Sequence, residues 1–291
     1  MKKIARIQFH GETRPLAQAW NAAHDHHIDL GIIVLDKALP EYQQLRALFT
    51  QFAAKYDVVW RERVTAEYTQ QELASFELFH VAIYGDGGEG NNTHAHVYDE
   101  VPVCDACGRV EYRQVRNLVV DLLEEQPDVE ETGYFQDDVC RTDFREIVVS
   151  EQVKQLFETH RVPGVELRPV EHCDPTTAQS ELAMIVPTYY QLLVETEIGP
   201  LVEPTPVQRH NRCTECGQFA QVLFDGQVFE IRSEYHFPRS SYDGAWIMQT
   251  ADAFGRGPRY GRDIVINQRL YQLFQEHGIT GIATYPAHIV E

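Results

Sequence analysis

Hydrophobic and polar residues alternate along the first sixty residues in a pattern that predicts a mixed α/β region. Residues 3–9 alternate with a period of two, as in a half-buried strand, and residues 32–35 form a short apolar run typical of a buried strand. A helix is predicted from Pro40 to about residue 56. Its apolar face consists of Leu45, Leu48, Phe49 and Phe52. Residues 58–64 alternate again and predict another strand.

The remainder of the chain contains a segment that occurs twice. Residues 145–169 resemble residues 262–286, with Arg145 aligned to Arg262 at an offset of 117 residues. Other identical pairs are Leu156 with Leu273, Phe157 with Phe274, His160 with His277 and Gly164 with Gly281. Most of the remaining pairs exchange one aliphatic residue for another. Chance does not explain this agreement, so we predict a duplicated module.

Each copy predicts the same local structure. A short apolar strand leads to a polar helix N-cap, Ser150 in the first copy and Asn267 in the second. A helix of about ten residues and a final strand follow. The apolar positions of the two helices are Val153, Leu156 and Phe157, and Leu270, Leu273 and Phe274. Gly278 is a typical C′ residue, whereas the first copy has Arg161 there and is predicted to end at Pro163-Gly164.

A short helix at 70–75 and a strand at 79–83 lie before the matching segment 145–169, and residues 190–194 are the expected counterpart of that strand in the second copy. The expected fold is therefore of the α+β class. We assign residues 1–64 to an N-terminal α/β region, 65–174 to the first repeat and 175–291 to the second. We expect the paired histidines at 160 and 277 to stabilise the helix C-termini rather than to act in catalysis.

Four of the six cysteines form two Cys-x-x-Cys-Gly motifs, which predict a zinc site. The motifs contribute Cys104 and Cys107, and Cys213 and Cys216. Two intervening residues allow a tight turn to direct both thiolates at one ion. The glycine that follows permits the positive φ that returns backbone N–H groups toward sulfur. Because structural zinc is tetrahedral, the two pairs fill one coordination sphere.

Three alternatives remain for these cysteines. Two separate zinc ions would each need histidines such as His94, His96 or His210. A redox role is opposed by the carboxylates of Asp105 and Glu215, which raise the pKa of a neighbouring thiol. Reduced cysteines without metal are the third alternative. Cys140 and Cys173 lack a partner at ligand spacing and are expected to be ordinary buried thiols.

Two polar segments suggest chemistry but are better explained as loops. Residues 24–27, His-Asp-His-His, lack ligands at helical spacing, and we expect an exposed loop. Residues 85–92 are glycine-rich but have no lysine at the phosphate-loop position, and we expect a hairpin turn. No serine-histidine-aspartate pattern and no His-Glu-x-x-His motif occurs in the sequence. An enzyme is therefore the less favoured class.

The charge of the chain restricts its partners. Lys and Arg number 25 and Asp and Glu number 44, so the formal net charge is −19. Phosphate backbones and anionic membrane surfaces are bound through Lys and Arg, so neither nucleic acid nor membrane is an expected partner. No apolar run approaches the roughly 20 residues that span a bilayer, and no apolar region follows Met1–Ile4. We expect a soluble, cytoplasmic protein. Residues 121–131 hold six acids and no base, which suits either a solvated linker or a contact surface for a basic partner.

The cysteine motifs, residues 73–79, the Ile-Val-Val-Ser-Glu-Gln-Val-Lys-Gln-Leu stretch at 147–156 and residues 164–169 together resemble the bacterial double-CXXCG motif family. The resemblance covers roughly residues 65–291. It departs at Arg161, where members of the family usually have glycine. Some members look like immunity proteins encoded beside secreted toxins. The resemblance therefore implies a non-enzymatic, zinc-stabilised protein that binds and inhibits a toxin. The alternative is an enzyme whose site is assembled from scattered residues.

Overall fold

A computed structural model describes residues 2–86, 97–120, 137–142, 145–172, 188–217, 219–224, 229–230, 235–256 and 261–291. Helices and strands are both abundant and are not arranged as regular βαβ units, so the α+β class is confirmed. The chain forms two compact units. Unit 1 comprises Met1–Phe76 with Phe224–Glu234, and unit 2 comprises Glu77–Leu223 with Tyr235–Glu291.

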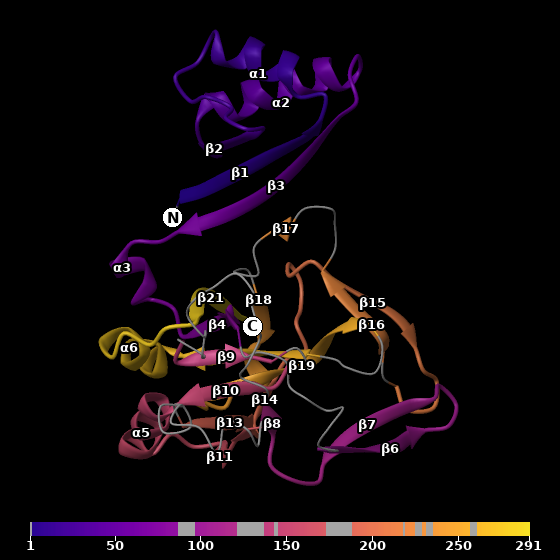
Figure 1. Ribbon diagram of the computed structural model, residues 1–291, viewed down its shortest axis with the longest axis vertical. Helices are drawn as coiled ribbons and strands as arrows, with labels where there is room; N and C mark the ends of the chain where they lie inside the picture. Colours follow the sequence, from indigo (N-terminus) through magenta and orange to yellow (C-terminus); the bar gives the residue numbers. More distant parts are fainter. Residues whose placement is uncertain are drawn as a thin grey trace. The chain divides into compact units, whose positions relative to one another are not determined.

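Unit 1 is a four-stranded sheet in the order β17-β3-β1-β2, with two helices on one face (Figure 1). Its strands are β1 (Lys2–Gly11), β2 (Ile32–Asp36), β3 (Val58–Glu67) and β17 (Phe229–Glu230). Its helices are α1 (Arg14–Asn21), α2 (Pro40–Ala53) and the one-turn α3 (Gln70–Leu73). The core between sheet and helices includes Ile7, Leu16, Trp20, Leu35 and Leu45. Leu48, Phe49 and Phe52 pack against this core, as the predicted helical face requires.

Two features of unit 1 differ from the sequence-based expectation. Strand β2 is an edge strand whose residues alternate between buried and exposed, because the two helices of unit 1 cover one face of the sheet. Its apolar run therefore does not mark a fully buried strand. Helix α1 was not predicted, since it is short and has only Leu16 and Trp20 buried.

Unit 2 contains two larger sheets. The five-stranded sheet has the order β11-β13-β10-β9-β5. Its strands are β5 (Gly85–Asp86), β9 (Val139–Arg141), β10 (Ile147–Ser150), β11 (Val165–Pro169) and β13 (Tyr189–Val194). The eight-stranded sheet has the order β15-β16-β19-β20-β4-β21-β18, with β14 paired to β19. Its strands are β4 (Leu78–Ile83), β14 (Glu197–Ile198), β15 (Val207–Arg212), β16 (Phe219–Phe224), β18 (Tyr235–Pro238), β19 (Ile247–Arg256), β20 (Gly261–Asn267) and β21 (Ile282–Val290).

Smaller elements complete unit 2. Two further pairs of strands are β6 (Tyr98–Cys104) with β7 (Arg109–Gln114), and β8 (Val119–Val120) with β12 (Glu171–His172). The helices are α5 (Glu151–His160), α6 (Gln268–Glu276) and the 3-10 helix η3 (Arg239–Ser241). Helix α5 packs on β10 and β13, and α6 packs on β20 and β4. In Figure 1 these two helices lie at one end of unit 2, and the β6–β7 and β15–β16 hairpins lie at the other.

The two proposed repeats exchange a strand. Strand β4, from the first, lies between β20 and β21 of the second, and β13, from the second, lies between β10 and β11 of the first. The strands of the two repeats pair in equivalent registers. Val148 pairs with Gln191, and Val265 pairs with His80. The strands on the other side of the exchanged ones, β11 and β21, also pair in equivalent registers: Leu167 pairs with Leu192, and Thr284 pairs with Val81. This equivalence supports the duplication, which stays a prediction.

The helices of the two repeats begin alike and end differently. The side chains of Ser150 and Asn267 accept hydrogen bonds from the N–H groups of Val153 and Leu270, as the predicted N-caps require. Helix α6 is followed by Gly278 at φ +62°. Helix α5 ends at Arg161 itself, which adopts the left-handed conformation at φ +52°. The expectation that Pro163-Gly164 ends this helix was therefore wrong, because Arg161 takes the conformation that glycine takes in the second copy.

Candidate metal centre

Each Cys-x-x-Cys-Gly motif forms the turn of a β-hairpin in unit 2. Cys104 is the last residue of β6, and Cys107 lies in the turn that leads to β7. Cys213 directly follows β15, and Cys216 precedes β16. The glycines after the second cysteines have positive φ, +69° at Gly108 and +71° at Gly217. This is the conformation that the motif predicts, and few other residues adopt it at low cost.

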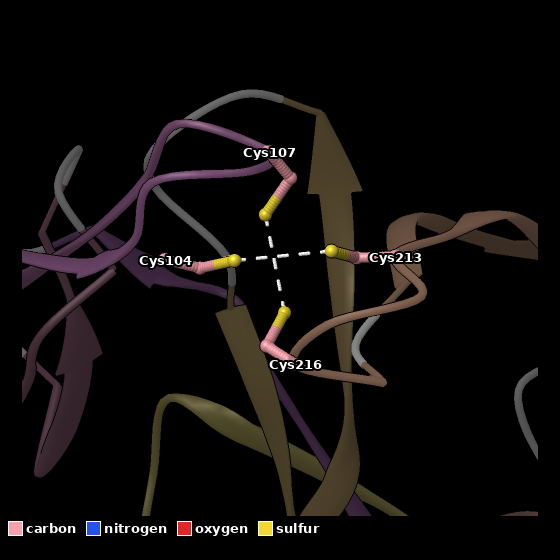
Figure 2. A group of neighbouring side chains, drawn as sticks. All are labelled: Cys104, Cys107, Cys213 and Cys216. Carbon is pink, nitrogen blue, oxygen red and sulfur yellow. Dashed lines mark hydrogen bonds between the residues drawn. The ribbon is translucent and has the colours of Figure 1, made fainter.

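The two hairpins bring all four cysteine sulfurs together, as Figure 2 shows. The Sγ atoms of Cys104 and Cys213 are 3.8 Å apart, and those of Cys107 and Cys216 are 3.9 Å apart. All four sulfurs lie within 4.8 Å of one another. These separations are far longer than the bond of about 2.05 Å in a disulfide. The cluster is therefore a set of four free thiols that could hold a metal ion.

The spacing of the sulfurs fits a tetrahedral ion. Four sulfurs placed at about 2.3 Å from a central ion, at the corners of a tetrahedron, are about 3.8 Å from one another. The separations of 3.8 and 3.9 Å each join a sulfur of one hairpin to a sulfur of the other. A bound ion would therefore join the hairpin of the first proposed repeat to that of the second. With four protein ligands it would have no open position for water or substrate.

Backbone N–H groups around the cluster favour thiolate. The N–H groups of Cys216 and Glu215 approach the Cys213 sulfur and lower the pKa of Cys213 to about 7. The N–H of Arg109 acts in the same direction on Cys107, but the neighbouring thiols, first that of Cys104, raise the pKa of Cys107 to about 12. Four adjacent sulfurs cannot all be anionic without a cation between them. A divalent ion removes this repulsion and allows full deprotonation.

The other candidate residues that the structure describes do not join the cluster. His210 is exposed, and its ring contacts Gln208. His94 and His96, named in the two-ion alternative, lie outside the described residues, as does Cys173. Cys140 is fully buried in β9, as expected of a packing thiol. Among the described residues, the four cysteines are the only group of three or more His, Cys, Asp or Glu side chains placed to hold a metal.

The remaining polar segments behave largely as loops. Residues 24–27 lie outside helices and strands; the His24 ring stacks on Trp20 at 3.6 Å, and the other three residues are exposed. The predicted hairpin turn at 85–92 begins instead with strand β5, and residues 87–92 lie outside the described residues. The acidic residues 121–131 also lie outside them. Nearby Asp138 has a structural role, because its carboxylate accepts hydrogen bonds from Ser150 and Thr280.

Sequence reasoning missed a cleft in unit 2 of about 700 Å³. Residues from the β6–β7 hairpin line it together with residues from β10, β13, β19 and β20. Its charged lining residues are Arg109, Arg113, Arg145, Arg168, Arg262, Glu111 and Glu146. They are scattered along the chain, so no local sequence motif predicts that they line one cleft. The identity of Arg145 and Arg262 in the repeat alignment was the one available signal.

Comparison with known proteins adds no assignment. No protein-family model matches the sequence, and no curated protein matches it. The resemblance to the double-CXXCG family therefore stays a prediction. Within the part of the chain that the structure describes, no helix has both the length and the apolar character needed to cross a membrane.

Proposed function

We propose that this protein is a zinc-stabilised binding protein without catalytic activity, and that its partner is a basic protein. The observation that carries the proposal is the cluster of four cysteines from two hairpins, with cross-hairpin sulfur separations of 3.8 and 3.9 Å. Such a set uses every coordination position of a tetrahedral ion. The metal then holds the fold together and does not activate a substrate.

Zinc is the proposed ion because four thiolates in tetrahedral geometry favour zinc or iron–sulfur chemistry. Cys-x-x-Cys-Gly turns are typical of structural zinc sites. Metal analysis of the purified protein should give one zinc per chain and no visible absorption, whereas an iron–thiolate centre is coloured. A ratio near two would favour separate sites, and a ratio near zero would reject the metal. Four reduced cysteines also suit the cytoplasm, which we propose as the compartment.

A basic partner is proposed from charge. With 44 acids against 25 bases, the chain attracts a cationic protein over long range and repels anionic ones. The resemblance to immunity proteins implies that the partner is a toxin. The genes that flank this one identify the candidate to purify. A toxin reading frame beside it would supply the partner, and an operon of metabolic enzymes would favour catalysis instead.

The acidic stretch 121–131 is the proposed contact, and its charge can be removed selectively. The test variant replaces Glu124, Glu125, Glu130 and Glu131 by Gln. It should bind the partner more slowly than the wild type and with a weaker dependence of the association rate on salt. The matched control converts four acids of unit 1 to their amides: Glu12, Asp25, Asp57 and Glu67. Equal association rates and salt slopes for the test variant and the wild type would reject this contact.

The cleft of about 700 Å³ is the observation that favours the second candidate, an enzyme of unknown reaction. Its volume is in the range of small-molecule sites, and Glu146 lies in its wall. Arginines outnumber carboxylates there by five to two, and no histidine is among its lining residues within the described part of the chain. This composition is better suited to holding an anion than to transferring protons.

A further inference from the structure

The cleft lies where the two proposed repeats meet. Arg145 and Arg262, which align at an offset of 117 residues, both line it, and so do the equivalent pair Ile147 and Ile264. The two isoleucines are in β10 and β20, the strands that lead into α5 and α6. Each proposed repeat therefore contributes one guanidinium group of this equivalent pair to the site.

The charged residues that line the cleft are mainly cationic, although the protein as a whole is acidic. The chain has a net charge of −19, yet five arginines and two glutamates line this cavity. Two of the arginines are held by exposed carboxylates: Arg168 donates to Glu166 through two nitrogens, at 2.7 and 2.9 Å, and Arg262 pairs with Glu197. These pairs neutralise part of the charge and fix the direction of each guanidinium. A rigid guanidinium recognises an anion at less entropic cost than a mobile one.

Arg145 is held by hydrogen bonds from both its backbone and its side chain. Its backbone has φ +71°, and its N–H donates to the Thr142 carbonyl at 2.8 Å. Its Nη1 donates to the Phe254 carbonyl at 3.2 Å, a neutral group that does not cancel the guanidinium charge. The side chain passes over Gly261, where a Cβ atom would lie 2.2 Å from Nη1. A glycine at that position therefore leaves the space that Arg145 occupies.

Apolar surface accompanies the arginines. Ile147, Leu192, Val194 and Ile264 contribute to the lining, and Tyr98 stands at the β6–β7 side. The Gln114 side chain of β7 donates to buried Gln191 of β13 at 2.8 Å, which ties the hairpin to the five-stranded sheet. The cavity therefore combines fixed cations with an apolar wall, and its volume suits a small organic molecule.

We propose that this cleft binds a small organic anion that carries a carboxylate or phosphate group on an apolar body. Arg145 supplies the principal charge for the anionic group, and Arg262 lines the same cleft from the equivalent position of the second repeat. Planar guanidinium groups match both carboxylate and phosphate oxygens through paired N–H donors. The isoleucine and leucine side chains cover the apolar part of the ligand. This binding site is independent of the proposed partner and of the identity of the metal.

The test uses three probes on the full-length, metal-loaded protein: phenyl phosphate, benzoate and, as the uncharged control, benzyl alcohol. Binding is followed by calorimetry and by chemical-shift changes in low-salt buffer without phosphate. Phenyl phosphate or benzoate should bind with a saturable isotherm, and benzyl alcohol should bind at least tenfold more weakly. The stronger of the two anions assigns the ligand class. Equal binding of all three probes, or no binding of either anion, overturns the proposal.

Two variants assign the binding to Arg145. Arg145→Gln removes the charge and should weaken anion binding by roughly 10–100-fold, as expected for loss of a charged hydrogen bond. Gly261→Ala keeps the arginine but displaces it, and should weaken binding without changing net charge. Arg46→Gln, on the exposed face of α2 in unit 1, is the matched control and should bind as the wild type does. Wild-type affinity in both test variants, with unchanged thermal unfolding, overturns the assignment.

Discussion

The rings of Phe157 and Phe274 stack nearly parallel, with centroids 6.2 Å apart and planes inclined by 9°. The two residues occupy the same position in the repeat alignment, one on α5 and one on α6, and both are buried. His160 and His277, also equivalent, lie next to each other with ring centroids 6.4 Å apart. Residues that contact their own counterparts are expected where two copies are related by a local two-fold axis.

This contact predicts a coupled loss of stability. Phe157→Ala and Phe274→Ala should each lower the free energy of unfolding by about 3–5 kcal/mol, because each leaves a cavity in the core. The double variant should lose less than the sum of the two, because the first substitution already removes the ring contact, which is worth about 0.5–1.5 kcal/mol. Urea unfolding of the four proteins measures the coupling. Strict additivity would show that the two rings do not interact.

The left-handed residue at the end of α5 predicts a stabilising substitution. Arg161→Gly should raise the free energy of unfolding by about 1 kcal/mol, because glycine adopts φ +52° without the steric cost that arginine incurs. Gly278→Ala, at the corresponding end of α6, is the matched control and should lower it by a similar amount. Thermal unfolding of both variants shows whether each substitution raises or lowers the stability. Destabilisation by Arg161→Gly would mean that the arginine side chain makes contacts that outweigh its backbone strain.

Removal of the proposed metal should destabilise the protein, because a metal bound by all four cysteines would close a long loop. The cysteine pairs are 109 residues apart, and a cross-link over about 100 residues contributes about 4.7 kcal/mol in the chain-entropy treatment. A chelator should therefore lower the urea midpoint of the wild type substantially. Cys104→Ser should already be destabilised and should respond little to the chelator. Cys140→Ala, which leaves the cluster intact, should keep the full chelator response; an equal response in all three proteins would place the metal elsewhere.

The strand exchange predicts that the repeats do not fold separately. In the eight-stranded sheet β4 lies between β20 and β21, so a fragment of residues 175–291 lacks the strand that joins them. Both inner edges would then have unpaired backbone groups. Fragments 1–174 and 175–291 should form a stable complex when co-expressed, and 175–291 alone should lack dispersed amide resonances. Cooperative unfolding of the isolated 175–291 fragment would contradict the exchange.

The sequence allowed prediction of those features whose signals are local. The helical faces of α2, α5 and α6 follow from apolar spacing. The cysteine cluster follows from two short motifs of the same sequence pattern, each of which supplies half of the ligands that one tetrahedral ion needs. The exchange of β4 and β13 was not predictable in this way. An apolar strand such as Leu78–Ile83 signals that it is buried but does not specify which strands lie beside it. The cleft was missed for a related reason: Arg145 and Gly261 are far apart in the sequence, and they contact each other only through the tertiary structure.

The position of β4 has a consequence for synthesis of the protein on the ribosome. The first four residues of this strand, Leu78 to Val81, are all buried in the finished sheet, but their partners lie in β20 and β21, near the end of the chain. At about 5–20 residues per second, the partners emerge roughly 10–40 seconds after β4 does. During that interval an apolar strand with two free edges is exposed to other nascent chains. Productive folding of unit 2 therefore has to wait for β20 and β21, and a chaperone that shields β4 should raise its yield.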